Sequence, residues 1–129
     1  MAESIVKNKS YDFALRILKL YMLLSEKNHF AIANQIVKAG TSIGANVEEA
    51  LAGFSKKDFT AKMSIASKEA RETHYWLRLI RDAGLIDTNQ VKPLVTDSET
   101  LVKILTSIVK TSSTKGIATK NQKLSTKNC

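Results

Sequence analysis

The chain has 129 residues, of which 43% are hydrophobic, and this composition supports one core but not two. One proline and five glycines leave few helix breakers, which favours an all-helical fold over a β fold with many turns. The net charge of +8 is compatible with binding to nucleic acid, binding to an acidic protein or simple solubility.

The single cysteine, Cys129, excludes an internal disulfide and, without a second thiol or a histidine cluster nearby, a zinc site. The first residues lack the apolar stretch of a signal peptide, and no apolar run approaches the roughly 20 residues that cross a membrane. We therefore expect a cytoplasmic protein with no membrane partner.

Hydrophobic periodicity predicts a first helix from about Tyr11 to Ser25. Asn28 is predicted to cap a second helix that runs to about Ala52. The second helix contains small residues that should let a neighbouring helix come close, among them Gly40 and Gly44. The predicted core stripe of the first helix contains Phe13, Ile17, Leu20, Tyr21 and Leu24, widened by Ala14 and Leu18.

The third helix is predicted from Phe59 to Arg81, because Ser55 and Asp58 have the spacing of a capping box. It carries two apolar stripes, and a helix that is apolar on two sides needs two burial partners. The first stripe, assigned to the core, contains Phe59, Met63, Ala66, Ala70, Leu77 and Ile80. We predict that the second forms a subunit contact in a homo-oligomer, made by Ile65, Glu72, Trp76 and Leu79, with Tyr75 beside them.

Gly84 is predicted to end the third helix and Asp87 to open a fourth, with Pro93 in its first turn. The three connections are short, so consecutive helices should be antiparallel neighbours in an up-down-up-down four-helix bundle over residues 1–110. Residues 111–129 contain four lysines, no acidic residue and no periodic apolar face, and we expect a disordered, flexible basic tail. The fourth helix has its core stripe at Leu94, Ser98, Leu101, Leu105 and Ile108.

The region from Asn34 to Leu85 resembles the bacterial four-helix-bundle proteins named for the intervening sequences of the 23S rRNA gene. The resemblance rests on Ser42, Ile43, Asn46, Val47, Glu49, Ala50, Ile65, Ala66, Glu69 and Glu72. The chain departs from the usual pattern at Lys38, where arginine is common, at Gly44, where proline is frequent, and at Ala50, where glycine is common.

This resemblance implies a small all-helical protomer, a ring-shaped homopentamer and no enzymatic activity. The chain is also similar to the accessory variability determinant of diversity-generating retroelements, a basic pentamer that binds nucleic acid and a reverse transcriptase. The spacing of residues does not give a subunit number, so the expectation of a pentamer follows from the resemblance alone.

The helices carry no recognisable catalytic or metal-binding motif. A di-iron bundle needs a Glu-x-x-His motif on each of two helices, whereas here Glu26 and His29 fall in the first connection and His74 follows Arg71. Ser67 and Glu72 do not complete a triad with His74, because Glu72 lies on another face of the helix. We therefore expect no catalytic residues, no metal, no cofactor and no enzymatic activity.

Ser42, Asn46 and Glu49 form a polar ridge beside the core stripe of the second helix. The ridge could be a binding site. We favour a structural role, in which its side chains form hydrogen bonds to the third helix and fix the register of the two helices.

Basic residues make the third helix the best candidate for a functional surface. Ser67, Arg71, His74, Arg78 and Arg81 follow four- and three-residue steps along one ridge. Arginine suits both phosphate forks and buried ion pairs, so the ridge is either a nucleic-acid site or a solvated face with local ion pairs. The predicted nucleic-acid-binding residues are Lys56, Lys57, Lys68, Arg71, Arg78 and Arg81.

Two functions remain open at this stage. The first is a non-enzymatic, oligomeric accessory factor that binds the backbone of RNA or DNA, for which the resemblance adds a reverse transcriptase as a partner. No exposed aromatic platform for stacking bases is evident, so binding should read backbone and shape. The alternative is an interaction scaffold whose basic face binds an acidic protein.

Overall fold

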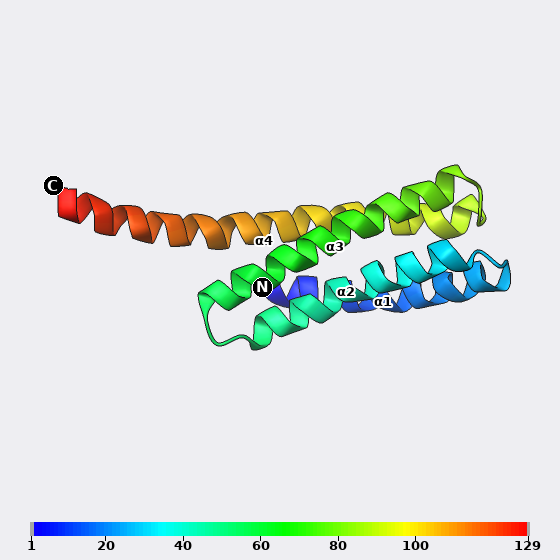
Figure 1. The fold of residues 1–129 in the computed structure, drawn as a ribbon, viewed down its shortest axis with the longest axis horizontal. Coiled ribbons are helices and arrows are strands. Elements are labelled where there is room, and N and C mark those ends of the chain that lie inside the picture. The colour runs from blue at the N-terminus through cyan, green and yellow to red at the C-terminus, as the bar shows by residue number, and fades with distance from the viewer. Residues whose placement is uncertain (1, 129) are drawn as a thin grey trace.

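The computed structural model describes the backbone of residues 2–128 and the side chains of residues 3–113. Over this range the chain forms four helices, α1 (Ala2–Glu26), α2 (Phe30–Ala52), α3 (Lys56–Asp82) and α4 (Thr88–Asn128) (Figure 1). Each helix packs against the next in sequence, and α1 closes the bundle against α4, whereas no Cα atoms of the diagonal pairs α1–α3 and α2–α4 come within 8 Å of each other among the described residues. The predicted antiparallel four-helix bundle is confirmed.

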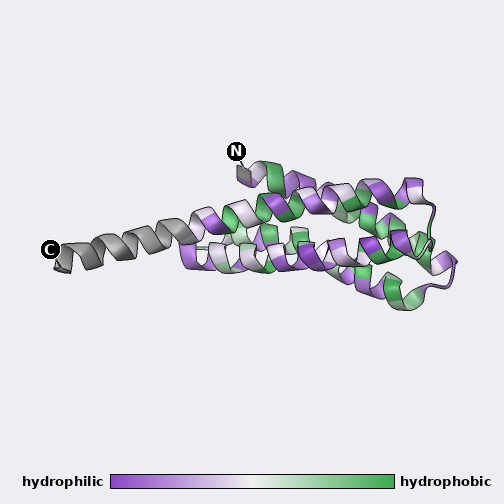
Figure 2. Ribbon diagram, turned by 90° about the horizontal axis from the view of Figure 1, so that it is seen from above, coloured by the Kyte–Doolittle hydropathy of each residue, from purple (hydrophilic) through white to green (hydrophobic). Residues whose placement is uncertain are grey.

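The core lies along the bundle axis and is built from one face of each helix. Figure 2 shows apolar and polar residues alternating along the helices, the pattern that buries one side and leaves the other wet. The predicted core positions of α3 and α4 are buried, apart from Phe59 and Ile108, which are partly buried and pack against the core. The largest fully buried side chains are Phe13, Ile17, Leu24, Ile36, Ile43, Met63, Leu77, Ile80, Leu101 and Leu105.

The ends of α3 follow from local chemistry. The Ser55 side chain accepts a hydrogen bond from the backbone N–H of Asp58 at 3.0 Å, as the capping-box spacing predicted. Gly84 has a φ of +66°, a left-handed conformation that glycine adopts at no steric cost. Leu85 N–H then donates to the carbonyl oxygen of Ile80 at 3.2 Å, which satisfies a free carbonyl at the end of the helix.

Two predicted helix boundaries and the predicted place of Pro93 were wrong. Helix α1 begins at Ala2 and not near Tyr11, because Val6 continues the buried stripe through a segment that is otherwise polar. Asn28 does not cap α2, since its φ of 65° places it in the left-handed turn that ends α1. Pro93 lies inside α4, in the second turn and not the first, because α4 starts at Thr88.

Helices α1 and α2 approach closely at two glycines, as the small residues of α2 predicted. A Cβ atom on Gly40 would lie 2.7 Å from Cγ2 of Ile17, and one on Gly44 would lie 3.3 Å from the backbone oxygen of Ser10. Leu18, which was predicted to widen the core stripe of α1, points outward and is 44% exposed. The core face of α1 is therefore narrower than predicted.

Helix α4 continues past Lys110. The hydroxyl of Ser112, which is 8% exposed, forms a hydrogen bond with the hydroxyl of Thr60 on α3. The remainder of the predicted tail, residues 114–129, lies outside the residues whose side chains are described, and its disorder stays a prediction.

We expect Gly40→Val to lower the free energy of unfolding by about 1–3 kcal/mol, because the added methyl groups meet the fully buried side chain of Ile17. Urea denaturation measures the effect. Ala45→Val places the same side chain on an exposed position of α2 and serves as the control. Equal losses for the two variants would contradict a close contact at Gly40.

Candidate nucleic-acid interface

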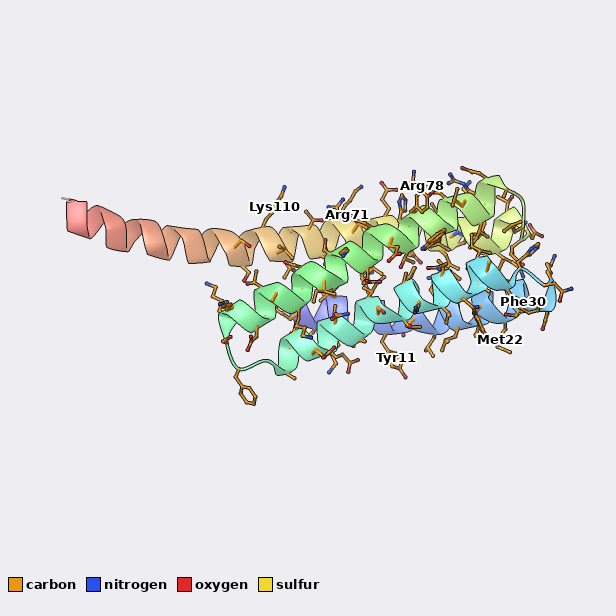
Figure 3. All side chains as sticks on the ribbon, viewed as in Figure 1. Tyr11, Met22, Phe30, Arg71, Arg78 and Lys110 are labelled. Atoms are coloured by element: carbon orange, nitrogen blue, oxygen red, sulfur yellow. The ribbon has the colours of Figure 1, made fainter. Side chains whose placement is uncertain are left out.

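Basic side chains from two helices gather where α3 lies against α4. Arg71 of α3 reaches across to α4, where its Nη2 donates a hydrogen bond to Oγ1 of Thr106 at 2.9 Å. A shallow depression between the helices is lined by Arg71, Lys103 and Lys110. Arg78 follows two turns along α3, and Figure 3 shows Lys110, Arg71 and Arg78 along one edge of the molecule. We call Arg71, Arg78, Lys103 and Lys110 the basic face.

The predicted site is only partly brought together. Lys56, Lys57 and Lys68 are exposed, but Lys56 and Lys57 begin α3, far from Arg78 along the helix. Nε of Arg81 lies 2.8 Å from Oδ1 of Asp82, so the charge of Arg81 is compensated by its neighbour. Lys68 lies about one turn before Arg71 but does not line the depression between α3 and α4. Of the predicted set, we assign Arg71 and Arg78 to the basic face.

Sequence reasoning missed Lys103 and Lys110. They are seven residues apart on α4, so they lie on the same side of that helix, and this spacing is the one signal that could have found them. Their place beside Arg71 follows from how α3 and α4 align, which the spacing alone does not give.

The basic face has one internal ion pair. Nζ of Lys103 lies 3.5 Å from Oε1 of Glu99, and the two side chains are 75% and 56% exposed. Exposed pairs of this kind contribute about 0–1 kcal/mol, so Lys103 can exchange Glu99 for a phosphate at small cost.

His74, between Arg71 and Arg78 on α3, is less readily protonated than a free histidine. Burial lowers the pKa of His74, and the positive charges of Arg78 and Arg81 act in the same direction against an opposing effect of Glu99. On the far side of α3, burial and the negative charge of Glu72 raise the pKa of Glu69.

An aromatic side chain stands beside the basic face. Tyr75 is 49% exposed, and its ring meets Trp76 edge to face, with centroids 5.2 Å apart and an angle of 69°. The guanidinium carbon of Arg78 lies 5.9 Å from the centroid of the Tyr75 ring, within cation–π range. The expectation that no exposed aromatic platform is present was therefore wrong.

The predicted subunit contact on α3 differs from the structure at one residue. Ile65 and Leu79 are 41% and 40% exposed and Glu72 is exposed, so these three form an outward stripe, called here the α3 stripe. Trp76, in contrast, is half-buried and packs against the core, so its predicted position on a face remote from the core was wrong. Its indole N–H is buried without a hydrogen-bond partner among the described residues.

A second outward apolar stripe lies on α1 and was missed from the sequence. It consists of Tyr11, Leu15, Leu18 and Met22, which are 44–61% exposed and follow steps of four, three and four residues. We call it the α1 stripe. Figure 3 shows Tyr11 and Met22, together with Phe30 of α2, along the edge opposite the basic face.

The polar ridge of α2 is satisfied mostly within its own helix. Oγ of Ser42 donates to the carbonyl oxygen of Lys38 at 2.6 Å, and Nδ2 of Asn46 donates to that of Ser42 at 2.8 Å. Only Glu49 reaches α3, where its Oε1 lies 3.4 Å from Nζ of Lys62. The predicted hydrogen bonds from the ridge to α3 are therefore limited to Glu49.

No group of three or more His, Cys, Asp and Glu side chains in the described part of the chain is arranged to hold a metal ion. No described helix is long and apolar enough to span a bilayer.

Fold and surface together define a class of small antiparallel four-helix bundles with a basic face and a separate apolar edge. The family model of the 23S rRNA-intervening sequence protein matches residues 2–107, and the chain belongs to this family. The predicted family resemblance is confirmed at this level.

One solved relative is similar over almost its full length. It is a protein of unknown function from the S23 ribosomal protein family of Bacteroides thetaiotaomicron, with 44% sequence identity and a TM-score of 0.80. The alignment covers 85% of this chain and 99% of that chain. The comparison with curated proteins found no match.

We expect the pKa of His74, followed by proton NMR, to lie below 6.5, because burial and Arg78 disfavour the imidazolium. The unfolded chain then binds a proton more readily than the folded protein, so stability falls as the pH drops through 6.5 toward the lower, folded value. His74→Gln should remove this part of the pH dependence, whereas His29→Gln should retain it. A His74 resonance that titrates above 6.5 would refute the assignment.

Proposed function

We propose that this protein is a non-enzymatic accessory factor that binds the phosphate backbone of RNA or DNA through its basic face. The observation that carries the proposal is the convergence of Arg71 and Arg78 from α3 with Lys103 and Lys110 from α4. Within this set, the one acidic partner among the described side chains is Glu99, held in an exposed and weak pair.

The chemistry of these side chains suits phosphate. Arginine presents a planar fork of donors to phosphate oxygens, and lysine adds point charges that release counterions from the backbone. Such contacts position a nucleic acid without reading its bases. The resemblance to the accessory variability determinant adds a nucleic-acid enzyme, such as a reverse transcriptase, as a proposed protein partner.

The test is a triple variant, Arg71→Gln, Arg78→Gln and Lys110→Gln. We expect the triple variant to lose a similar factor of affinity for nucleic acids of unrelated sequence. The slope of log affinity against log salt should be flatter by roughly 0.7–0.9 per lost contact. Titrations with labelled RNA and DNA at several salt concentrations measure both quantities.

The control removes three positive charges outside the basic face, at Lys7 and Lys19 of α1 and at Lys27 in the connection to α2, all of which are exposed. Equal losses for both triple variants would mean that binding follows the overall charge and that no site exists between α3 and α4. If the wild type binds no nucleic acid at low salt, the basic face serves an acidic protein partner and the proposal falls.

We also propose that the protein self-associates through its two apolar stripes. The α1 stripe and the α3 stripe are exposed on helices that lie diagonally across the bundle, so they point away from each other. Contacts between two different patches are head-to-tail, and they close into a ring when the rotation between subunits allows it. A ring of five, as the resemblance implies, would display the basic face five times and raise avidity for one long nucleic acid.

Two single variants test this arrangement. Leu18→Glu disables the α1 stripe and Leu79→Glu disables the α3 stripe, and we expect each variant alone to be a monomer by light scattering, because a charge is placed in an apolar contact. Mixed together, the two should form a 1:1 heterodimer and nothing larger, since one intact stripe remains on each partner. An unchanged mass for either variant, or no association in the mixture, would contradict a head-to-tail contact.

A further inference from the structure

We propose that the basic face binds a single strand in preference to a duplex, and that Tyr75 is the residue on which a base of that strand stacks. This inference rests on the proposed function and adds to it the class of nucleic acid and a residue outside the set of phosphate contacts. Three observations support it: the spacing of the cations, the exposure of the Tyr75 ring, and the contacts that fix that ring.

The cations of the basic face follow one another along the seam between α3 and α4. The bond between Arg71 and Thr106 places these two residues at the same level of the bundle. Because α3 and α4 are antiparallel, Lys110 then lies about one turn from Arg71 toward the start of α3, and Lys103 lies about one turn from it toward the end of α3. Arg78 follows one turn beyond Lys103 in that second direction.

Measured along the helix axes, successive cations alternate between α4 and α3 at levels about 4.5–6 Å apart, given a rise of 1.5 Å per residue. An extended single strand can follow such a series, with successive phosphates meeting successive cations. A strand in a duplex instead winds around its axis and turns away from the seam after one or two contacts.

The ring of Tyr75 is placed to receive a base from a strand along this seam. Tyr75 is four residues after Arg71 and three before Arg78, so it is the surface neighbour of both on α3. Half of its surface is exposed, and the edge-to-face contact with the half-buried Trp76 holds the ring in one orientation. Proteins that bind single strands combine a basic surface for the backbone with exposed aromatic rings for the bases, and Tyr75 beside the basic face fits this combination.

The contact between Arg78 and the Tyr75 ring does not block this site. An exposed cation–π contact is weaker than the stacking of a base on an aromatic ring. When a strand binds, the guanidinium of Arg78 moves to a phosphate and a base takes its place over the ring. In a duplex the bases are already stacked on one another, so Tyr75 would have no partner there.

The experiment compares Tyr75→Leu with wild type on a labelled single-stranded oligonucleotide and on a duplex of the same sequence. We expect about tenfold weaker single-strand binding, as for the loss of one base stack, and unchanged duplex binding. Tyr75→Phe, which keeps the ring, should bind the single strand as wild type does. Phe54→Leu removes an exposed aromatic ring from the connection between α2 and α3, outside the basic face and both apolar stripes, and is the matched control.

A spectroscopic signal supplies a second readout. Trp76 is the single tryptophan of the chain, and its ring touches that of Tyr75. The single strand should therefore change the tryptophan fluorescence of the wild type and of Tyr75→Phe, and the duplex should not.

The outcomes separate this inference from the proposed function. If Tyr75→Leu binds the single strand as tightly as wild type does, or loses single strand and duplex equally, the stacking role is wrong. The proposed function still stands in that case if the triple variant at Arg71, Arg78 and Lys110 binds both the single strand and the duplex more weakly than wild type does. If wild type binds neither ligand, the proposed function fails together with this inference.

Discussion

The burial of one side of α3 between α2 and α4 is the constraint on which the rest of the structure depends. Ala66, Ala70 and Thr73 are fully buried on this side, and their small size lets both neighbouring helices pack against α3. Because the inner side of α3 serves two contacts, its two flanks meet different helices. The flank toward α4 carries Arg71, which bonds to Thr106, and the flank toward α2 carries Lys62, which pairs with Glu49.

The basic face and the α1 stripe, which carry the two proposed functions, lie on separate parts of the surface. The basic face lies on the seam between α3 and α4, whereas the α1 stripe lies on the opposite edge of the bundle (Figure 3). Self-association through the α1 and α3 stripes would leave the seam open to solvent. Weak contacts to phosphate, one set per subunit, would then act on the same strand, which gives a gain in affinity without any new contact.

The sequence predicted the features that depend on local chemistry and periodicity. Ser55 and Gly84 mark the ends of α3 by the hydrogen bond and the backbone conformation that these residue types favour. Asn28 was wrongly predicted to cap α2, because asparagine favours both helix caps and left-handed turns. In the structure it adopts the left-handed conformation.

Features that depend on the relative position of two helices could not be predicted from the sequence pattern of either helix. Lys103 and Lys110 join Arg71 only because α4 lies at a particular level against α3. Trp76 was expected on the outer surface from its angular position on α3, yet a side chain of this size reaches back along the flank to the core. The α1 stripe was overlooked because Leu18 was counted with the core stripe, although it continues the outward series from Tyr11 to Met22.

The order in which the helices touch has a consequence for how the chain folds. Each helix packs mainly against its neighbour in sequence, and the contact between α1 and α4, which includes the ion pair of Arg16 with Asp97, is the smallest in the bundle. Most native contacts therefore close short loops, and such topologies fold quickly because little chain entropy is lost before each contact forms. Helical hairpins can form one after another, and the seam between first and last helix closes at the end.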